Sequence, residues 1–385
     1  MNVILFDTNR INYYPLSYTR PISEFLIGIM TIKQKWEQFY DSVSVKTEDY
    51  LSNKFPLVIK EDNLWVNAKT IPSSELYVEL NNLRKGESLE KNGELIAFRN
   101  NSFTTDKLNA IDSNVAVFTI ESLYDLFLYN SREIKKDFIT LTKHKISKEI
   151  DSTNKLIGKN VFIEEGANIS CSIINADKGP VYIGRNANIM EGSIIHGPFA
   201  MLENSTLKMG AKIYGGTTLG PYCKVGGEVN NSVFFGYSSK AHDGFLGNSI
   251  IGSWCNLGAA TNVSNLKNNY ANVKLWNYTT NSFSNTNLQF CGMIMGDHSK
   301  SGINTMFNTG TVIGIGANIF GSGFPRNFIP SFSWGGAHGF SVYDLNKFLS
   351  VVALVYDRRQ KSLTDTDKEI LSEVYNLTKQ YRNQR

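Results

Sequence analysis

The feature of this chain that most restricts its fold is a repeat of six residues between positions 183 and 230. Every sixth position holds an aliphatic side chain, and the position four residues later is usually small. The aliphatic positions are Ile183, Ile189, Ile195, Met201, Leu207, Ile213, Leu219 and Val225. A period of six matches neither the 3.6-residue repeat of an α-helix nor the two-residue alternation of a plain strand. It predicts a solenoid of three-sided coils, in which short strands form the sides and like side chains stack along the axis.

The repeat extends beyond this run, from residue 156 to about residue 319. With roughly eighteen residues in each three-sided coil, it predicts roughly six or seven coils. Two segments interrupt the pattern, 175–180 and 263–290. Because they are rich in turn-forming and polar residues, we expect both to loop outward.

The residues on either side of the repeat have globular character. Residues 1–150 carry strand-like runs at 2–6 and 115–120 and a helical pattern over 120–138, which predict an α/β domain. Helical patterns over 342–361 and 364–382 predict helices that cap the open end of the solenoid. The expected parts are an α/β domain over 1–150, a β-helix over 151–335 and a helical cap over 336–385.

Composition is that of an ordinary soluble protein. Of the 385 residues 42% are hydrophobic and 19% are charged, and the net charge at pH 7 is +4. No cluster of Lys and Arg is long enough to favour nucleic acid, and no run of eighteen apolar residues predicts a membrane span. The first residues show no export signal, and four scattered cysteines without a C-x-x-C pair favour reduced thiols. We therefore expect a cytoplasmic protein without nucleic-acid or membrane partners.

The polar break in the repeat, over residues 239–274, is where we expect chemistry. There His242 and Asp243 interrupt the aliphatic rhythm, and the turn that contains Ala259 follows one coil later. Because coils stack in register, His242 should face that turn. A histidine can accept a proton from an attacking amine, and main-chain N–H groups of the turn can hold an oxyanion. The alternative is a corner histidine that only hydrogen-bonds to Asp243.

The residues of this break resemble a known enzyme family. The series SKAH (239–242), FLG (245–247), NLGAAT (256–261), NNY (268–270) and Lys274 looks like the acetyltransferase half of the bifunctional N-acetylglucosamine-1-phosphate uridylyltransferase / glucosamine-1-phosphate N-acetyltransferase family, most closely its divergent bacteroidete-type branch. The resemblance implies a left-handed parallel β-helix, assembled as a homotrimer, with acetyl-CoA between neighbouring subunits.

The same resemblance implies roles for individual residues. His242 matches the general base of the family. The residues that match or adjoin its substrate and acetyl-CoA contacts are Lys240, Asn256, Ala259, Asn269, Tyr270 and Lys274. The chain departs from the family at Phe245, where a substrate-binding tyrosine is expected, and at residues 230–231, where two asparagines replace a basic pair. These departures leave the identity of the sugar phosphate open.

The N-terminal residues resemble the sugar-nucleotidyltransferase half of the same family. The sequence YPLSYTRP at 14–21 looks like the R-x-x-P-L-T end of its signature, and residues 28–37 continue the resemblance. However, the stretch that should cradle a triphosphate, FDTNR at 6–10, contains no glycine, although such loops bind phosphate through bare backbone N–H groups.

Charged residues of the N-terminal part could still bind a nucleotide. Arg10, Arg20 and Lys35 are the candidate phosphate ligands, and Asp7 is the candidate ligand for Mg²⁺. A working nucleotidyltransferase and a domain retained only for packing or binding both stay open.

Other histidines carry weaker signals. The five histidines are too widely spaced in sequence for the three-histidine zinc site known on some β-helices, so we expect no zinc. His298, beside Asp297 and Lys300, is a candidate second active-site group, with a solvated turn as the alternative.

Together these observations predict acetyl-CoA-dependent N-acetylation of an amino-sugar phosphate, such as glucosamine-1-phosphate, with coupled nucleotidyl transfer as an additional activity. A sugar-1-phosphate nucleotidyltransferase alone and a non-catalytic trimeric scaffold are the alternatives.

Overall fold

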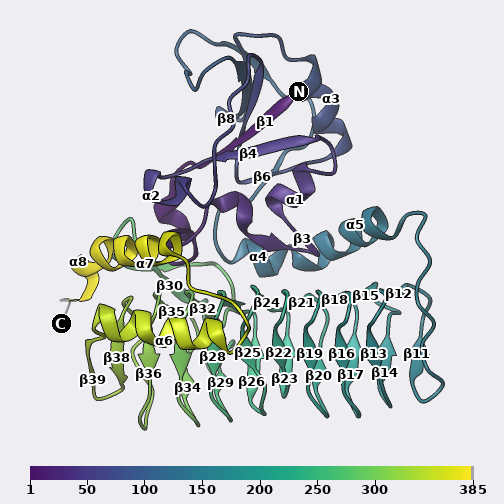
Figure 1. Ribbon diagram of the computed structural model, residues 1–385, viewed down its shortest axis with the longest axis vertical. Coiled ribbons are helices and arrows are strands. Elements are labelled where there is room, and N and C mark those ends of the chain that lie inside the picture. The colour runs from purple at the N-terminus through teal and green to yellow at the C-terminus, as the bar shows by residue number, and fades with distance from the viewer. Residues whose placement is uncertain (383–385) are drawn as a thin grey trace.

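The structure is a computed structural model that describes residues 1–382. It consists of an N-terminal α/β region, a parallel β-helix and C-terminal helices, as the sequence predicted. In Figure 1 the β-helix forms a long base on which the α/β region stands, and the C-terminal helices lie beside its last coils. No helix of the described residues is both long enough and apolar enough to cross a membrane.

The α/β region is built on a six-stranded sheet of order β4-β1-β5-β8-β7-β9. Its strands are β1 (Asn2–Phe6), β4 (Ser42–Lys46), β5 (Asn63–Asn67), β7 (Glu87–Lys91), β8 (Glu94–Asn100) and β9 (Asn109–Asp112). All five residues of β1 are buried, because β1 lies between β4 and β5 and pairs parallel to both. Its nearly continuous apolar sequence is typical of such a central parallel strand.

Short elements complete this region. Two small strand pairs are β2 (Leu26–Ile27) with β3 (Met30–Thr31) and β6 (Thr70–Ile71) with β10 (Phe118–Thr119). The helices are η1 (Arg10–Tyr13), η2 (Leu16–Tyr18), η3 (Ile22–Glu24), α1 (Ile32–Trp36), α2 (Asp49–Ser52), α3 (Ser74–Asn82), α4 (Asp125–Leu128) and α5 (Asn130–Thr142).

The helix expected over 120–138 begins later, at Asp125, and is divided into α4 and α5. The Asp125 carboxylate accepts the backbone N–H groups of Glu121 and Ser122, which holds the chain in a turn before the helix. The strand expected over 115–120 is likewise shorter, because only β10 pairs there.

Three parallel sheets form the walls of the β-helix, here named faces A, B and C. Face A contains β11 (Lys155–Ile157), β14 (Ile173–Asn175), β17 (Ile194–His196), β20 (Lys212–Ile213), β23 (Glu228–Asn230), β26 (Phe245–Gly247), β29 (Asn262–Val263) and β34 (Met306–Phe307). Face B contains β12 (Val161–Ile163), β15 (Val181–Ile183), β18 (Phe199–Met201), β21 (Thr217–Leu219), β24 (Val233–Phe234), β27 (Ile250–Ile251), β32 (Met293–Met295), β35 (Thr311–Ile313) and β37 (Phe328–Ile329). Face C contains β13 (Asn168–Ile169), β16 (Asn188–Ile189), β19 (Thr206–Leu207), β22 (Lys224–Val225), β25 (Ser239–Lys240), β28 (Asn256–Leu257), β33 (Lys300–Ser301), β36 (Asn318–Ile319) and β38 (Ser333–Gly336), with β39 (Gly339–Val342) added antiparallel.

The coils are more numerous than expected. Face B has nine strands, one for each coil, instead of the six or seven predicted. The prediction was too low because the coils continue beyond residue 319 to β37 and β38, and because some coils are shorter than eighteen residues: Leu219 pairs with Phe234, only fifteen positions later. The aliphatic residues of the repeat are buried inside the coils, as the ladder model requires.

The interruption over 263–290 leaves the wall of the β-helix, as predicted. It forms the hairpin of β30 (Lys274–Asn277) and β31 (Ser282–Asn285). The hairpin packs against the α/β region, where Tyr278 contacts the rings of Tyr14 and Tyr18 edge-on at 5.6 and 6.1 Å. This insertion therefore helps to hold the α/β region on the β-helix.

The C-terminal helices are α6 (Leu345–Asp357), α7 (Asp365–Leu377) and α8 (Lys379–Arg382). Side-chain caps start the first two, since Asp344 accepts from the Lys347 N–H and Thr364 from the Asp367 N–H. Helix α6 runs along the last coils in Figure 1 instead of across the open end. Its Tyr356 stacks on Trp254 at 4.2 Å, at the corner between faces B and C. Division of the chain into domains at residues 150 and 335 remains our proposal.

Candidate functional site

His242 lies at the corner between faces C and A, in the turn that joins β25 to β26, and its side chain is exposed. One coil later, the Ala260 N–H donates to the Asp243 carbonyl at 3.0 Å. The predicted register is therefore confirmed, and His242 faces the turn that contains Ala259. Within residues 1–382 the imidazole makes no hydrogen bond, so it is not tied to the Asp243 side chain.

The turn opposite His242 presents an unused backbone donor. On either side of Ala259, the Gly258 N–H donates to the Ser301 carbonyl and the Ala260 N–H donates to Asp243. The N–H of Ala259 itself has no acceptor among the described residues. Asn256 is exposed on face C, paired in register with Ser239 of the preceding coil. An exposed imidazole and a free N–H donor thus stand on adjacent coils.

Lys240 lies inside the β-helix, although it was expected among the ligand-binding residues. It pairs in register with Val225, takes that residue's place in the inward ladder and is 1% exposed. Its Nζ donates to the Gly226 carbonyl at 3.2 Å and to the His242 carbonyl at 2.7 Å. Burial lowers the pKa of Lys240 to about 8, against the opposing attraction of Asp243. This lysine supports the His242 turn from within and does not face a ligand.

The other expected binding residues lie elsewhere in the chain. Asn269, Tyr270 and Lys274 are exposed in the insertion that leaves the β-helix between faces A and B. His242 is at the opposite edge of face A. Within one chain, therefore, the structure does not bring these residues together with His242.

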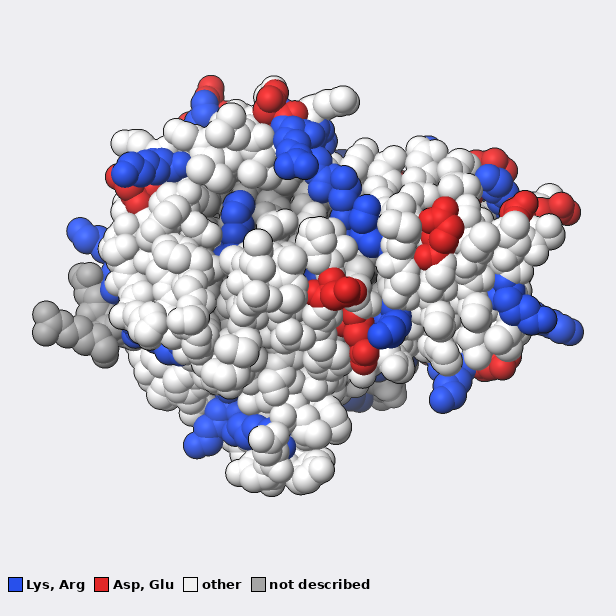
Figure 2. Space-filling view, turned by 90° about the horizontal axis from the view of Figure 1, so that it is seen from below, with Lys and Arg blue, Asp and Glu red and all other residues white. Residues whose placement is uncertain are grey.

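Basic side chains gather on the side of the molecule seen in Figure 2. Lys224 lies on the β-helix, and its partial burial lowers its pKa. The charges of Arg359, Lys208 and Arg358 lower it further. We name Lys208, Lys224, Arg358 and Arg359 the basic band. Lys224 belongs to face C, the face that His242 borders, and none of the four forms an ion pair within the described part of the chain.

The candidate phosphate ligands of the α/β region are held by internal carboxylates. Arg10 pairs with Asp7 at 2.5 Å, and both side chains are buried. Lys35 of α1 is buried between Asp137 at 2.5 Å and Glu133 at 3.1 Å, both on α5. These charges bind the region's own elements together, so the expectation that Arg10 and Lys35 face a phosphate does not agree with their positions.

Asp7 does not fit a magnesium site. One of its carboxylate oxygens accepts from Arg10 and from the Thr47 hydroxyl, and the other accepts from the Ile22 N–H at 2.9 Å. With both oxygens engaged, the side chain has little capacity left for a cation. Among the described residues, no group of three or more His, Cys, Asp or Glu side chains is arranged to hold a metal ion.

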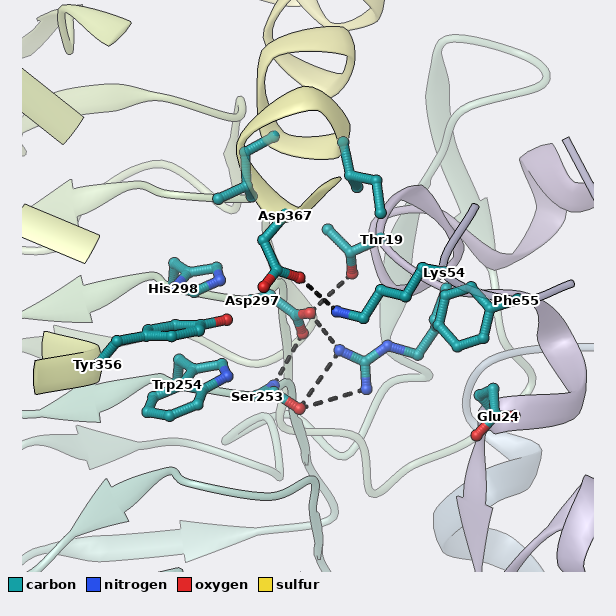
Figure 3. Close-up of a pocket in the computed structure, with 13 residues that line it drawn as sticks. Thr19, Glu24, Lys54, Phe55, Ser253, Trp254, Asp297, His298, Tyr356 and Asp367 are labelled. Carbon is teal, nitrogen blue, oxygen red and sulfur yellow. Dashed lines mark hydrogen bonds and ion pairs between the residues drawn. The ribbon is translucent and has the colours of Figure 1, made fainter. Parts of the chain in front are cut away.

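Arg20 lies where the three parts of the molecule meet, beside a cavity of about 210 Å³ that we name the junction pocket (Figure 3). It pairs with Asp297, which also accepts from the Thr19 hydroxyl at 2.7 Å and the Ser253 N–H at 2.8 Å. At the mouth, Lys54 pairs with Asp367 of α7 at 2.7 Å. These two ion pairs join the α/β region to the β-helix and to the C-terminal helices.

His298 lines this pocket and is not in a solvated turn, so that alternative is wrong. It is 6% exposed, and its ring lies near the rings of Trp254 and Tyr356, with centroids at 6.4 and 6.1 Å. Burial lowers its pKa to about 3, outweighing the attraction of Asp297. The imidazole is therefore neutral at physiological pH.

A ladder of aromatic rings lies at the corner between faces B and C, and the sequence patterns above did not predict it. Its members have left-handed backbone conformations, with φ between 57° and 66°: Tyr222, Tyr237, Trp254, His298 and Phe332. The same corner of earlier coils holds Asn186 and Asn204, which suit this conformation better. Bulky rings where asparagine is expected were the signal that could have revealed a covered corner.

Comparison with known proteins gives a family match for the α/β region and a relative that covers about half of the chain. Residues 3–146 match the family model described as sugar nucleotidyl transferase. Over 218 residues the chain is 32% identical to the bifunctional protein GlmU of Methanococcus maripaludis, which covers 55% of this chain. The match spans 46% of that relative, about half of its length.

Solved structures show weaker likeness. The polySia-specific acetyltransferase NeuO is 12% identical, with a TM-score of 0.29, over 50% of this chain and 87% of its own. The Francisella novicida UDP-N-acetylglucosamine acyltransferase is 12% identical, with a TM-score of 0.32, over 60% of this chain and 76% of its own. At these TM-scores the two structures support no conclusion about this chain. The α/β region therefore matches a sugar nucleotidyl transferase family model, and about half of the chain is similar to a bifunctional GlmU protein, while the coils described above follow the matched N-terminal residues.

Proposed function

We propose that this protein transfers an acetyl group from acetyl-CoA to the amine of an amino-sugar phosphate, at the corner between faces C and A. The observation that carries the proposal is the pairing, on adjacent coils, of the exposed His242 side chain with the free Ala259 N–H. A proton acceptor and an oxyanion donor are the two groups that acyl transfer to an amine needs most.

In the proposed reaction the sugar ammonium gives a proton to His242, and the free amine nitrogen then attacks the thioester carbonyl. The new C–N bond forms as the C–S bond breaks, the nitrogen loses a proton, and the departing sulfur takes up that proton to become the free thiol. The Ala259 N–H would stabilise negative charge on the carbonyl oxygen. Lys240 acts indirectly, because its ammonium holds the His242 carbonyl at 2.7 Å.

The basic band supports acetyl-CoA as the acyl donor. Acetyl-CoA carries several phosphate charges, and the four cations of the basic band, which form no ion pair with the described residues, would attract them. Asn269, Tyr270 and Lys274 stand at a different corner, so a site that used both sets would need a neighbouring subunit. We therefore propose a homotrimer in which each site is shared. Free buried thiols at Cys223, Cys255 and Cys291 suit a reducing compartment such as the cytoplasm.

Acyl transfer is favoured over nucleotidyl transfer by the ion pairs of the α/β region. Arg10 and Lys35 are each buried against carboxylates, and Arg20 is bound to Asp297. A nucleotidyltransferase alone remains the second candidate, supported by the family match over residues 3–146. This second activity predicts that the protein releases pyrophosphate when it is given UTP, a sugar-1-phosphate and Mg²⁺.

The test compares His242→Ala with His196→Ala in a thiol-release assay with acetyl-CoA and glucosamine-1-phosphate. His196 is a matched control, a half-buried histidine of β17 stacked on Tyr214. We expect His242→Ala to lose about 10²- to 10⁴-fold in rate and His196→Ala to keep the wild-type rate. Full activity in His242→Ala would refute the assigned role. A wild type that releases no thiol and gains no thermal stability from acetyl-CoA would instead favour the scaffold.

A further inference from the structure

The junction pocket contains buried polar atoms that lack partners. His298 Nδ1 and Arg20 Nε are both shielded from solvent and make no hydrogen bond within the described residues. Buried polar groups are paired in the great majority of cases, and each exception calls for an explanation. The His298 ring edge faces the cavity in Figure 3, so a molecule in the pocket could supply its missing partner.

The charges around the pocket nearly cancel. Arg20 is neutralised by Asp297 and Lys54 by Asp367, while burial raises the pKa of the remaining carboxyl group, Glu24. A phosphate or carboxylate ligand would meet three acidic side chains and no spare cation. An amine would meet two cations, and these already occupy two of the three carboxyl groups with which it could pair. The pocket therefore suits an uncharged ligand.

The remaining wall offers hydrogen-bonding groups beside aromatic rings. The Tyr356 hydroxyl points toward the cavity, and its ring stacks on Trp254 at 4.2 Å. Glu24 accepts no hydrogen bond from the described side chains, and Lys54 has donors beyond the one used by Asp367. Hydroxyl groups can both donate to and accept from such a set, and C–H faces of a ring can pack on the aromatic side chains.

We propose that the junction pocket binds an uncharged sugar or a sugar-like polyol, held by His298, Arg20 and Tyr356. The site lies at the corner between faces B and C, whereas the proposed acyl-transfer site lies at the corner between faces C and A. The inference is therefore independent of the proposed function. A bound polyol would touch all three parts of the chain and strengthen their association.

The experiment measures binding of D-glucose and myo-inositol to the full chain by isothermal titration calorimetry, with glucose-1-phosphate as the charged comparison. The informative variant is His298→Phe, which keeps a ring and removes both nitrogens. Phe332 already occupies this corner in a later coil with φ 57°, so the fold tolerates phenylalanine there. Tyr237→Phe, which changes a ladder ring outside the pocket, is the matched control.

We expect saturable one-to-one binding of glucose or inositol, weakened at least about tenfold in His298→Phe and unchanged in Tyr237→Phe and His242→Ala. The proposal is overturned if neither uncharged probe binds, if glucose-1-phosphate binds more tightly than glucose, or if His298→Phe binds like the wild type. Loss of binding in His242→Ala alone would place the sugar at the acyl-transfer corner and would also overturn it. Loss of acetyl transfer in His242→Ala with glucose binding intact would support both proposals separately.

Discussion

Two histidine corners border face C of the β-helix, and they are built from the same parts. Next to His242 stand Asp243 and a lysine whose ammonium donates to the His242 carbonyl at 2.7 Å. Next to His298 stand Asp297 and Lys300, whose ammonium donates to the His298 carbonyl at 3.1 Å. Yet the first imidazole is exposed, and the second is 6% exposed beneath Tyr356 of α6.

The difference between these corners comes from what covers them. At the His242 corner nothing among the described elements covers the imidazole, so it is free to exchange a proton with a substrate. At the His298 corner the C-terminal helices and the α/β region cover the imidazole, and burial depresses its pKa to about 3. One corner is therefore suited to acid–base chemistry and the other to packing and recognition. Substitutions at matching positions can test this division.

The largest contrast should come from the two aspartates. Asp297→Asn leaves Arg20, whose side chain is 13% exposed, without its counter-ion, and breaking a buried pair costs about 3–5 kcal/mol. Asp243→Asn changes an exposed carboxylate that makes no ion pair or side-chain hydrogen bond within residues 1–382, and it should alter stability by less than about 0.5 kcal/mol. Urea unfolding of both variants measures the contrast. If both variants lost the same free energy of unfolding, covering the corner would not determine how much its aspartate contributes to stability.

The six-residue period was enough to predict the β-helix and the neighbourhood of His242 and Ala259. Both depend on local spacing, because a repeat read along the chain fixes which residues stack on the next coil. The period did not predict that Lys240 points inward. Lys240 follows Val225 by fifteen residues instead of eighteen, and this short coil moves it into the ladder.

The junction pocket could not be derived from the sequence. It depends on the meeting of Arg20, Asp297 and Asp367, which are far apart in the chain and come from three parts of the fold. The candidate cations were recognised by residue type, but their carboxylate partners were not, because nothing local links Lys35 of α1 to Asp137 of α5. Long-range pairing of charges decided which cations remained free.

A second contrast separates stability from activity at the open corner. Lys240→Leu replaces a buried ammonium by the side chain that Leu257 already provides in the next coil of this ladder. The folded-state pKa is lowered to about 8 from 10.5, so the lysine opposes folding at neutral pH, and its cost disappears as pH rises through 10.5. We expect Lys240→Leu to raise the free energy of unfolding by about 1–4 kcal/mol, measured as a higher urea midpoint. The rate of thiol release should fall about tenfold.

The decoupling of these two effects is what the Lys240 experiment checks. Val225→Leu, one coil earlier in the same ladder, is the control for packing and should leave the rate unchanged. If Lys240→Leu keeps full activity, the bond from its ammonium to the His242 carbonyl does not position the turn.

A third contrast concerns acid. An unfolded histidine takes up a proton near pH 6.5, whereas folded His298 stays neutral down to about pH 3, so its contribution to stability is lost as pH falls through this window. At pH 5 the loss amounts to about 2 kcal/mol. His298→Phe should therefore flatten the decline in urea midpoint between pH 7 and 5. The charged groups that act on His298 are Asp297, which favours its protonation, and Lys300, Lys54 and Arg20, which oppose it.

The matched variant for the acid experiment is His242→Phe, at the exposed corner. His242 lies outside the junction pocket, so this variant controls for replacing a histidine by phenylalanine elsewhere in the chain. A decline that is equally steep in wild type and His298→Phe would mean that His298 takes up its proton without unfolding.

The smallest effect is expected at the edge of the covered corner, where Lys54 pairs with Asp367 at 2.7 Å. The Lys54 side chain is 44% exposed, and exposed ion pairs contribute only about 0.2–1 kcal/mol, so Lys54→Ala should shift the urea midpoint slightly. Raising the salt to 1 M shortens the screening length from about 10 to 3 Å and should reduce even this difference. Lys368→Ala, which removes a similar pair within α7, serves as the control. Lys54 and Arg20 line the same pocket and differ mainly in burial. If Lys54→Ala lowered the free energy of unfolding as much as Asp297→Asn, the burial of each charge would not determine how strongly its ion pair stabilises the contact between the three parts of the chain. The closure of the pocket would determine it instead.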